Sequence, residues 1–316
     1  MFTVPSDVYS MQRSEDGLNW SLFDPVEVPA LSLTYGDAFK LQYETYEASG
    51  CAVTVIPARD LWAIITRAQE ESGVPFIMYS DAINGEYMHS CTSSCRFDGG
   101  ARAALEKNNQ SHLGVVQTSN LCTEIVQYSS GEHTAVCTLA SVALPRFVRA
   151  DGSYDFEGLH AVTKLAVRGA DSLIDAADYP TDEAMESALQ TRAIGVGGQG
   201  LADVFMASGM PFASSQARSL NIAIYETIYH AAYEVSCELA QQRGCYPLYS
   251  GSPASSGRLQ HDMWVGAKTT GRYDFDVLRT HIVEHGLRNS MLTAQMPTAT
   301  TAKLLGNFDG VEPYSR

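Results

Sequence analysis

Residues 192–208 read RAIGVGGQGLADVFMAS, and this stretch indicates the class of fold. It opens with a short apolar run of the kind found in buried strands, and residues 200–208 then place apolar side chains at helical spacing. The glycines between the two halves predict a tight turn from strand to helix. GVGGQG, residues 195–200, also fits the GxGxxG pattern of dinucleotide-binding folds. Dinucleotide-binding folds also carry an acidic residue, on a second strand, that binds the ribose. No such residue follows here, so we interpret the glycines as a tight turn and not as a nucleotide site.

The alternation of strand and helix continues along the chain. Further helical patterns cover residues 35–49, 58–72, 156–178 and 215–243, and several of them stop at glycine or proline. Short apolar stretches that read as buried strands lie at residues 75–81, 115–126, 134–144 and 288–296. This alternation predicts an α/β fold with a mostly parallel, enclosed sheet or barrel. No Pro/Gly/Ser-rich linker divides the sequence, so we expect residues 1–316 to form a single domain.

The composition narrows the classes of function. The 316 residues are 45% hydrophobic and 18% charged, as in ordinary globular proteins, and the formal net charge is -15. Such a charge opposes nonspecific binding to nucleic acid or to an anionic membrane. The apolar stretches are short for a membrane span and the N-terminus lacks signal-peptide features, so we expect a cytoplasmic protein. Seven cysteines, an odd number, suit reduced thiols better than a secreted disulfide framework.

A thiol, an amide and an acid alternate in SNLCTEI, residues 119–125. If this segment is extended, Asn120, Cys122 and Glu124 share one face and can act on one substrate. The alternative is that Cys122 is only a small buried hydrophobic residue. A second thiol, Cys137, follows fifteen residues later and could form a redox pair with a partner cysteine. The spacing of these residues alone does not decide between a reactive and a purely structural role for the cysteines.

Hydroxyl groups gather in QMPTATTAKLLGN, residues 295–307. Pro297 suits the first position of a helix, and Thr298, Thr300 and Thr301 lie around the expected helix start. A helix N-terminus with flanking hydroxyls can bind an anion such as phosphate. The alternative is an ordinary helix capped by a threonine.

Ten segments of the chain, in order, resemble the large, catalytic subunit of ribonucleotide reductase, in the aerobic class that reduces ribonucleoside diphosphates. The eukaryotic and viral branch is the most similar. The segments lie at residues 19–31, 74–84, 107–114, 119–130, 135–144, 194–205, 221–240, 249–264, 286–307 and 311–315.

The resemblance implies a ten-stranded α/β barrel with a central finger loop that carries a radical cysteine, which is Cys122 here. A thiyl radical at Cys122 would abstract the ribose 3′-hydrogen, Glu124 would act as general base on the 3′-hydroxyl, and Asn120 would orient the substrate hydroxyls. Cys137 matches one half of the dithiol that reduces the 2′-position. Substrate contacts, including the diphosphate cradle, are implied at Ser119, Leu121, Pro297, Thr298, Ala299, Thr300 and Thr301.

The resemblance also implies partners. It implies no metal or cofactor bound by this chain, a radical supplied by a metal-containing small subunit, and a thioredoxin- or glutaredoxin-type reductant. The upstream cysteine that would pair with Cys137, the radical-relay tyrosines and the C-terminal thiol tail of the family have no match in the sequence. We therefore expect a piece of a split reductase that needs complementary large-subunit chains; the alternative is an inactive fragment or interaction subunit. A thiol–disulfide oxidoreductase is a third reading, disfavoured because no CxxC opens a helix.

Residues 85–106 interrupt the resemblance. The family has a very short connection there, whereas this chain has a polar, glycine-containing insertion that we expect to be a surface loop. Cys91, Cys95 and the nearby His89 could bind a metal, or the two thiols could form a disulfide. A solvated loop without either function is the interpretation we favour.

Overall fold

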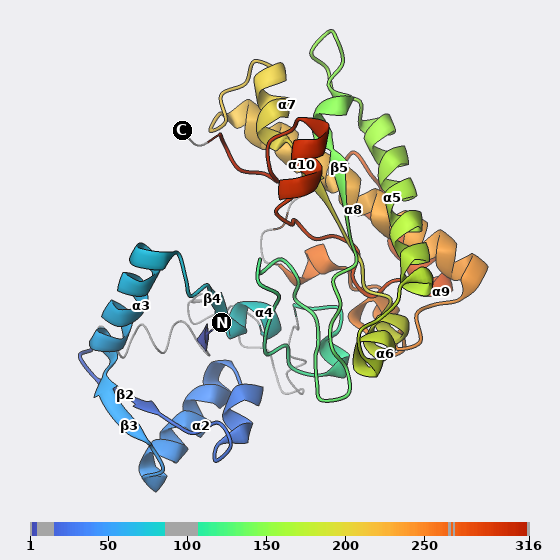
Figure 1. Ribbon diagram of the computed structural model, residues 1–316. Coiled ribbons are helices and arrows are strands. Elements are labelled where there is room, and N and C mark those ends of the chain that lie inside the picture. Colours follow the sequence, from blue (N-terminus) through green and yellow to red (C-terminus); the bar gives the residue numbers. More distant parts are fainter. Residues whose placement is uncertain (1, 5–15, 86–106, 265–266, 268, 315–316) are drawn as a thin grey trace, which may run out of the picture. The chain divides into compact units, whose positions relative to one another are not determined.

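The computed structural model describes residues 2–4, 16–85, 107–264, 267 and 269–314. The chain divides into two compact units, residues 1–128 and 129–316, which are coloured by sequence in Figure 1. Each unit is described by itself, and the prediction of one barrel domain over residues 1–316 stays a prediction. The insertion predicted at residues 85–106 lies outside the described residues except for Gly85, and so do Cys91 and Cys95.

The first unit is built from short strands and two helices of moderate length. Strand β1 (Phe2–Val4) pairs in parallel with β4 (Ile77–Tyr79), and β2 (Asn19–Leu22) pairs antiparallel with β3 (Thr54–Pro57). The helices are α2 (Gly36–Ser49), α3 (Ala58–Ser72) and the short α4 (Ser80–Asn84), with 3-10 turns η1 (Pro29–Leu33) and η2 (Ser111–Leu113). Both α2 and α3 end at a glycine in the left-handed conformation, as the sequence predicts.

The core of the first unit is small. Trp20, Phe39, Tyr43 and Ala58 form its buried cluster. The Tyr43 hydroxyl accepts a hydrogen bond from the Ser21 backbone N–H at 2.6 Å and donates one to the Ser21 carbonyl at 3.2 Å. This aromatic side chain therefore fixes α2 to β2, in the antiparallel β2–β3 pair, by both packing and hydrogen bonding.

The second unit centres on two long helices and a parallel strand pair. Strand β5 (Leu139–Ala143) pairs in parallel with β6 (Gly195–Gln199), with Leu139 opposite Gly195. Helices α5 (Phe156–Ala176) and α8 (Ser215–Arg243) pack side by side (Figure 1). The other elements are η3 (Leu144–Phe147), α6 (Asp182–Thr191), α7 (Leu201–Ala207), η4 (Pro253–Ser256), η5 (Gln260–Met263), α9 (Phe275–His285) and α10 (Ala299–Leu305).

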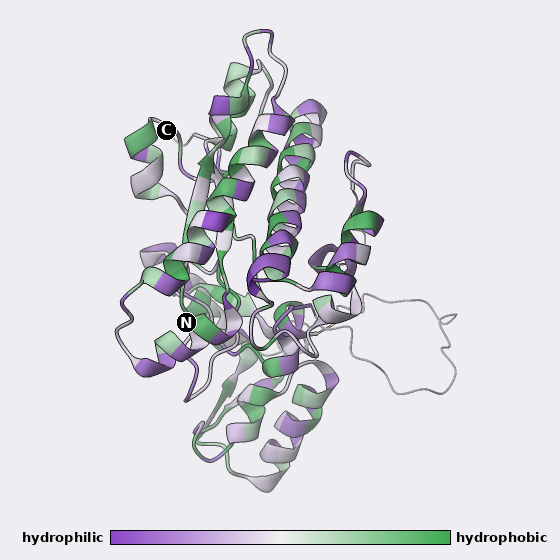
Figure 2. Ribbon diagram, turned by 90° about the vertical axis from the view of Figure 1, so that its right-hand side faces the viewer, coloured by the Kyte–Doolittle hydropathy of each residue, from purple (hydrophilic) through white to green (hydrophobic). Residues whose placement is uncertain are grey.

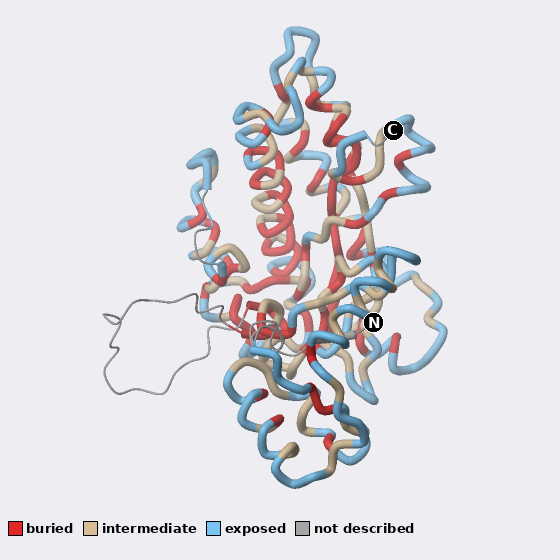
Figure 3. The backbone as a smooth tube through the Cα atoms, turned by 90° about the vertical axis from the view of Figure 1, so that its left-hand side faces the viewer, coloured by how far each residue is buried: buried red, intermediate tan, exposed pale blue. Residues whose placement is uncertain are grey.

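The second unit buries most of its apolar side chains. Its cluster draws residues from β5, β6 and helices α5 to α9, with Leu159, Ile224 and Leu287 completely inaccessible to solvent. Figure 2 shows hydrophobic and hydrophilic residues alternating along these helices, as expected for helices with one buried face. Figure 3 shows that buried stretches of the backbone follow the strands and the long helices of this unit.

The five helices predicted from the sequence are confirmed as α2, α3, α5, α7 and α8. The strand predictions hold only in part. Residues 75–81 and 134–144 contain the shorter strands β4 and β5, and residues 192–198 overlap β6. Residues 291–294 run in parallel beside β6 through backbone hydrogen bonds such as Val196 N–H to the Leu292 carbonyl at 2.9 Å, although they form only an isolated bridge.

The class of fold is thus mixed α/β, as predicted, but the barrel is not seen closed. The strands within the described residues form three separate two-stranded sheets. In the same part of the chain, no helix is both long enough and apolar enough to cross a membrane.

The glycines at residues 195–200 have a packing role. Strand β6 is entirely buried, and Gly200 adopts φ +78° to begin α7, which confirms the predicted turn from strand to helix. A Cβ atom on Gly197 would lie 2.3 Å from the Ala294 carbonyl oxygen, and one on Gly198 would lie 2.7 Å from Leu144. Glycine is therefore required because neighbouring backbone approaches β6 closely, and no nucleotide is needed to explain the motif.

Candidate active site

The segment around Cys122 is a turn, so the strand predicted at residues 115–126 is wrong. All twelve residues are described, and they carry no strand. The Thr123 backbone N–H donates to the Asn120 carbonyl at 3.1 Å, and Thr123 has φ 64°, in the left-handed region. Side chains consequently do not alternate between two faces as they would in a strand. The apolar pattern misled because short apolar runs also occur where a loop anchors its ends in a core.

Hydrogen bonds close the base of this turn. The Asn120 side-chain amide donates to Glu124 Oε2 at 2.7 Å, and Asn120 Oδ1 accepts from the Ile125 backbone N–H at 3.1 Å. The Ser119 hydroxyl donates to the Ile125 carbonyl at 2.5 Å, and the Ile125 side chain is buried. The amide and the acid therefore meet, as the sequence predicts, but across a turn and not along a strand.

Cys122 lies at the tip of the turn, between the two residues that close it. Its side chain is exposed, and so is Leu121 beside it. This position contradicts the alternative in which Cys122 is a small buried hydrophobic residue. An accessible thiol flanked by a hydrogen-bonded amide and carboxylate is chemically equipped for work on a bound substrate. The Ser119 hydroxyl, by contrast, is already engaged in holding the turn closed.

The second unit presents Cys137 and the threonine segment around one strand. Cys137 is exposed and lies two residues before β5. Further along β5, the Ser141 hydroxyl lies 3.3 Å from the Thr301 hydroxyl of α10, and it accepts a hydrogen bond from Gln199 at 2.9 Å. Four residues of extended chain cover about 13 Å, so Cys137 and Ser141 lie at most about that far apart along the chain.

The predicted helix after Pro297 exists, but it begins later than expected. Thr298 is the N-cap and Ala299 the first helical residue, so Pro297 precedes the helix. The Thr298 hydroxyl is buried and accepts from the Gly310 backbone N–H at 2.9 Å. Within the described part of the chain it makes no capping hydrogen bond, which contradicts the alternative of a threonine-capped helix.

The remaining side chains of the threonine segment face solvent. Ala299, Thr300 and Thr301 are exposed at the first turn of α10, where backbone N–H groups lack partners within the helix. The geometry thus separates their roles. Thr298 attaches the helix start to Gly310, and Thr300 is exposed to a ligand. Thr301 is exposed too, but its hydroxyl already donates to the Thr298 carbonyl at 3.2 Å and lies 3.3 Å from the Ser141 hydroxyl. The sequence could not separate these roles, because three threonines of similar spacing look equivalent in it.

A cluster of possible metal ligands was not predicted from the sequence. Among the described residues, His160, His230 and Glu234 bring their donor atoms within 4.8 Å of one another. The only sequence signal was the spacing of His230 and Glu234, which places both on one face of a helix. His160 comes from another helix, and nothing in its neighbourhood of the sequence points to the other two.

The whole chain resembles one family. Residues 3–316 match the family model described as "Ribonucleotide reductase, barrel domain". The ribonucleoside-diphosphate reductase large chain of Schizosaccharomyces pombe is 45% identical over 305 residues, covering 96% of this chain and 35% of the relative. The large subunit of Caenorhabditis elegans is also 45% identical, covering 96% and 36%, and large chain 2 of Saccharomyces cerevisiae is 46% identical over 314 residues, covering 98% and 33%.

The chain therefore spans about a third of the length of these relatives. The family match extends over nearly every residue of the chain, including the turn at Cys122 and the segment that begins α10. The chain belongs to the ribonucleotide reductase family, as part of the barrel domain of a large subunit.

Proposed function

We propose that this chain carries part of the catalytic centre of a ribonucleoside-diphosphate reductase. The observation that supports it best is the closed turn at residues 119–125, which holds Asn120 and Glu124 in a 2.7 Å hydrogen bond and leaves the Cys122 thiol exposed at its tip. The relatives' names supply the reaction, the reduction of ribonucleoside diphosphates. The product is the 2′-deoxyribonucleotide needed for DNA synthesis.

In this proposal the residues divide the chemistry between them. A thiyl radical at Cys122 removes the 3′-hydrogen of the ribose, and Glu124 accepts the proton of the 3′-hydroxyl. Asn120 orients the substrate hydroxyls while its hydrogen bond positions the Glu124 carboxylate. Cys137, as half of a dithiol, reduces the 2′-position, where hydroxide leaves as water after protonation, and the dithiol becomes a disulfide.

The proposal requires other protein partners. A radical-generating, metal-containing small subunit must produce the thiyl radical, and a thioredoxin- or glutaredoxin-type protein must reduce the disulfide. Other large-subunit segments must supply the partner of Cys137 and the strands that close the barrel. The reaction is placed in the cytoplasm, where such reductants keep thiols reduced.

The test is activity in a chimera. The corresponding third of the Schizosaccharomyces pombe large chain is replaced by this chain, and deoxyribonucleotide formation is measured with the small subunit and reductant. We expect turnover, with Glu124→Gln slower by on the order of a hundredfold or more because the general base is lost. Glu132→Gln, at an exposed glutamate of the second unit, is the control and should leave the rate unchanged. A folded chimera without turnover, or equal rates for Glu124→Gln and the control, would overturn the proposal.

We propose that the substrate diphosphate binds at the first turn of α10. Thr300→Ala should then weaken diphosphate affinity by roughly 1–2 kcal/mol without loss of thermal stability, because Thr300 is exposed and backbone N–H groups remain. Thr298→Ala should lower thermal stability, since it removes the acceptor for Gly310 N–H. Unchanged affinity in the Thr300→Ala, Thr301→Ala double variant would rule out this binding site.

A further inference from the structure

Helices α5 and α8 pack in parallel through side chains that match at a constant offset. His160 faces His230, Lys164 faces Glu234 and Arg168 faces Glu238, each pair separated by 70 positions. Toward the C-terminal ends of both helices, Lys164 and Arg168 form ion pairs with Glu234 and Glu238. At the N-terminal end of the row two imidazole rings face each other, and His160 also lies within ion-pair distance of Glu234.

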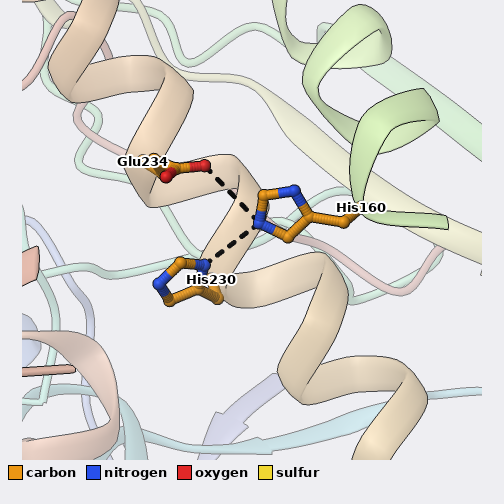
Figure 4. Close-up of side chains that lie close together, drawn as sticks. All are labelled: His160, His230 and Glu234. Carbon is orange, nitrogen blue, oxygen red and sulfur yellow. Dashed lines mark hydrogen bonds and ion pairs between the residues drawn. The ribbon is translucent and has the colours of Figure 1, made fainter. Parts of the chain in front are cut away.

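The geometry of His160, His230 and Glu234 suits a bound metal ion. His160 Nε2 lies 3.1 Å from His230 Nδ1 and 3.5 Å from Glu234 Oε2, and Figure 4 shows the three side chains converging from two helices. Zinc bonds of about 2.0–2.1 Å in a tetrahedral arrangement place neighbouring ligand atoms about 3.3–3.4 Å apart. Both distances measured from His160 Nε2 are within about 0.3 Å of that value.

An aromatic side chain holds the two rings in place. Tyr273 stacks on His230 with ring centroids 4.3 Å apart, and its ring centroid also lies 5.5 Å from that of His160. The two imidazoles are therefore fixed in the arrangement that brings their nitrogens together.

The charges around the cluster favour a cation. Glu234 and Glu238 balance Lys164 and Arg168, and one turn before His230 lies Glu226, which is buried. Glu226 Oε2 accepts from the Thr270 backbone N–H at 2.9 Å, whereas its Oε1 has no hydrogen-bond partner within the described residues. Such a buried, partly satisfied carboxylate is stabilised by a positive charge nearby. Lys164 shares Glu234 Oε2, but a carboxylate oxygen has more than one lone pair and Lys164 is also held by Glu238.

We propose that His160, His230 and Glu234 form a Zn²⁺ site that fastens α5 to α8. Two imidazole nitrogens and one carboxylate oxygen are a donor set that zinc uses in proteins, and they leave a fourth position for water. The ion replaces the hydrogen bond between the two rings, and the proton of that bond moves to the other nitrogen of its own ring, so that both imidazoles stay neutral. The inference does not depend on the proposed function, because none of these residues belongs to the candidate active site.

The experiment is a metal titration of the intact chain after its accessible thiols have been alkylated, with Zn²⁺ by calorimetry and Co²⁺ by visible absorption. We expect saturation at one ion per chain, a Co²⁺ spectrum of nitrogen and oxygen ligands, and a thermal midpoint raised by about 5 °C at excess Zn²⁺. His160→Gln, His230→Asn and Glu234→Gln should each weaken binding at least about tenfold, the smallest loss typical even of residues that only support a ligand.

His281→Gln is the matched control. His281 and His285 lie one turn apart on α9, and His281 is exposed, so they form a second histidine pair on one helix that is not part of the cluster with Glu234. We expect the control to bind metal as the unaltered chain does. Absence of saturable binding in the unaltered, alkylated chain would overturn the site, and so would equal affinity in the His160 variant and the control.

Discussion

The two units differ in how much of their apolar surface they bury. In the second unit, α8 alone buries fourteen of its residues, and its packing against α5 joins a core that reaches every long helix. In the first unit, Ala58 is the one buried residue of α3, and apolar side chains such as Leu41 and Ile64 are more than 60% exposed. The second unit therefore has the larger buried core, whereas few buried side chains hold the helices and strands of the first unit together.

This contrast matches the division of the candidate chemistry. The turn that carries Cys122 belongs to the first unit, whereas Cys137 and the start of α10 belong to the well-packed second unit. We therefore expect substitutions in the second unit to change mainly the stability of that unit, and substitutions in the first unit to act on a structure with a much smaller core.

The largest effect is expected at Asp171. This buried carboxylate accepts from Arg192 Nε at 2.9 Å and from Asn289 at 3.1 Å, and Arg192 is itself buried. Asp171→Asn removes the buried charge that faces Arg192, Arg243 and Arg288 and leaves Arg192 only the half-exposed Asp175. We therefore expect a loss of about 3 kcal/mol in the free energy of unfolding of the second unit. Asp178→Asn, at an exposed aspartate beyond the same helix, is the control. Denaturant melts that coincide for both variants would show that the network contributes little.

The next effect is expected at Gly197. An added methyl group would meet the Ala294 carbonyl oxygen at 2.3 Å, so Gly197→Ala should cost about 1–3 kcal/mol as β6 is pushed from its neighbour. Gly169 of α5 has open space around its Cα, and Gly169→Ala should instead be neutral or stabilising by up to about 1 kcal/mol. The measurement is the thermal midpoint of the two variants. A midpoint that shifts in the same direction in Gly197→Ala and in Gly169→Ala would contradict the close approach at β6.

A similar or smaller effect is expected in the first unit at Tyr43. Tyr43→Phe keeps the aromatic packing and removes the partner of the Ser21 N–H and carbonyl groups. We expect a loss of about 1–2 kcal/mol, confined to the first unit. Hydrogen exchange measured residue by residue provides the readout, with faster exchange in α2 and β2 and unchanged exchange in α8. Faster exchange throughout α8 would mean that the two units do not unfold separately.

The smallest effect is a pH dependence from the histidines between α5 and α8. Burial holds the pKa values of His160 and His230 below their usual value of about 6.5, so the unfolded chain binds more protons near that pH. Stability of the second unit should therefore fall as pH decreases below about 6.5. The double variant His160→Gln, His230→Asn should show a shallower decline, with His261 supplying part of what remains because burial lowers its pKa too. An equally steep decline of stability with decreasing pH in the unaltered chain and in the double variant would contradict a contribution from these two histidines.

The sequence predicted the elements whose signals are local. Helix α8 is predicted over the residues that form it, because its apolar spacing and the glycine at residue 244 are both read within one segment. The strand predicted at residues 115–126 failed, because the hydrogen bonds that turn the chain at Asn120 connect side chains that alternation does not reveal. Likewise, the different roles of Thr298 and Thr300 depend on Gly310, and the histidine cluster depends on a contact across 70 residues.

In the proposed reaction, Cys122 begins the chemistry and Cys137 completes it. The direct measurement is cleavage of an isotope-labelled 3′-carbon–hydrogen bond of the substrate, followed in the chimera together with deoxyribonucleotide formation. The account predicts that Cys122→Ser abolishes both, because an alcohol O–H bond is too strong for the hydroxyl to carry the radical. Cys137→Ser should still cleave the 3′-bond but form no clean product, and Cys51→Ser should behave as the unaltered chain. Cleavage of the 3′-bond by the Cys122→Ser protein would contradict the account.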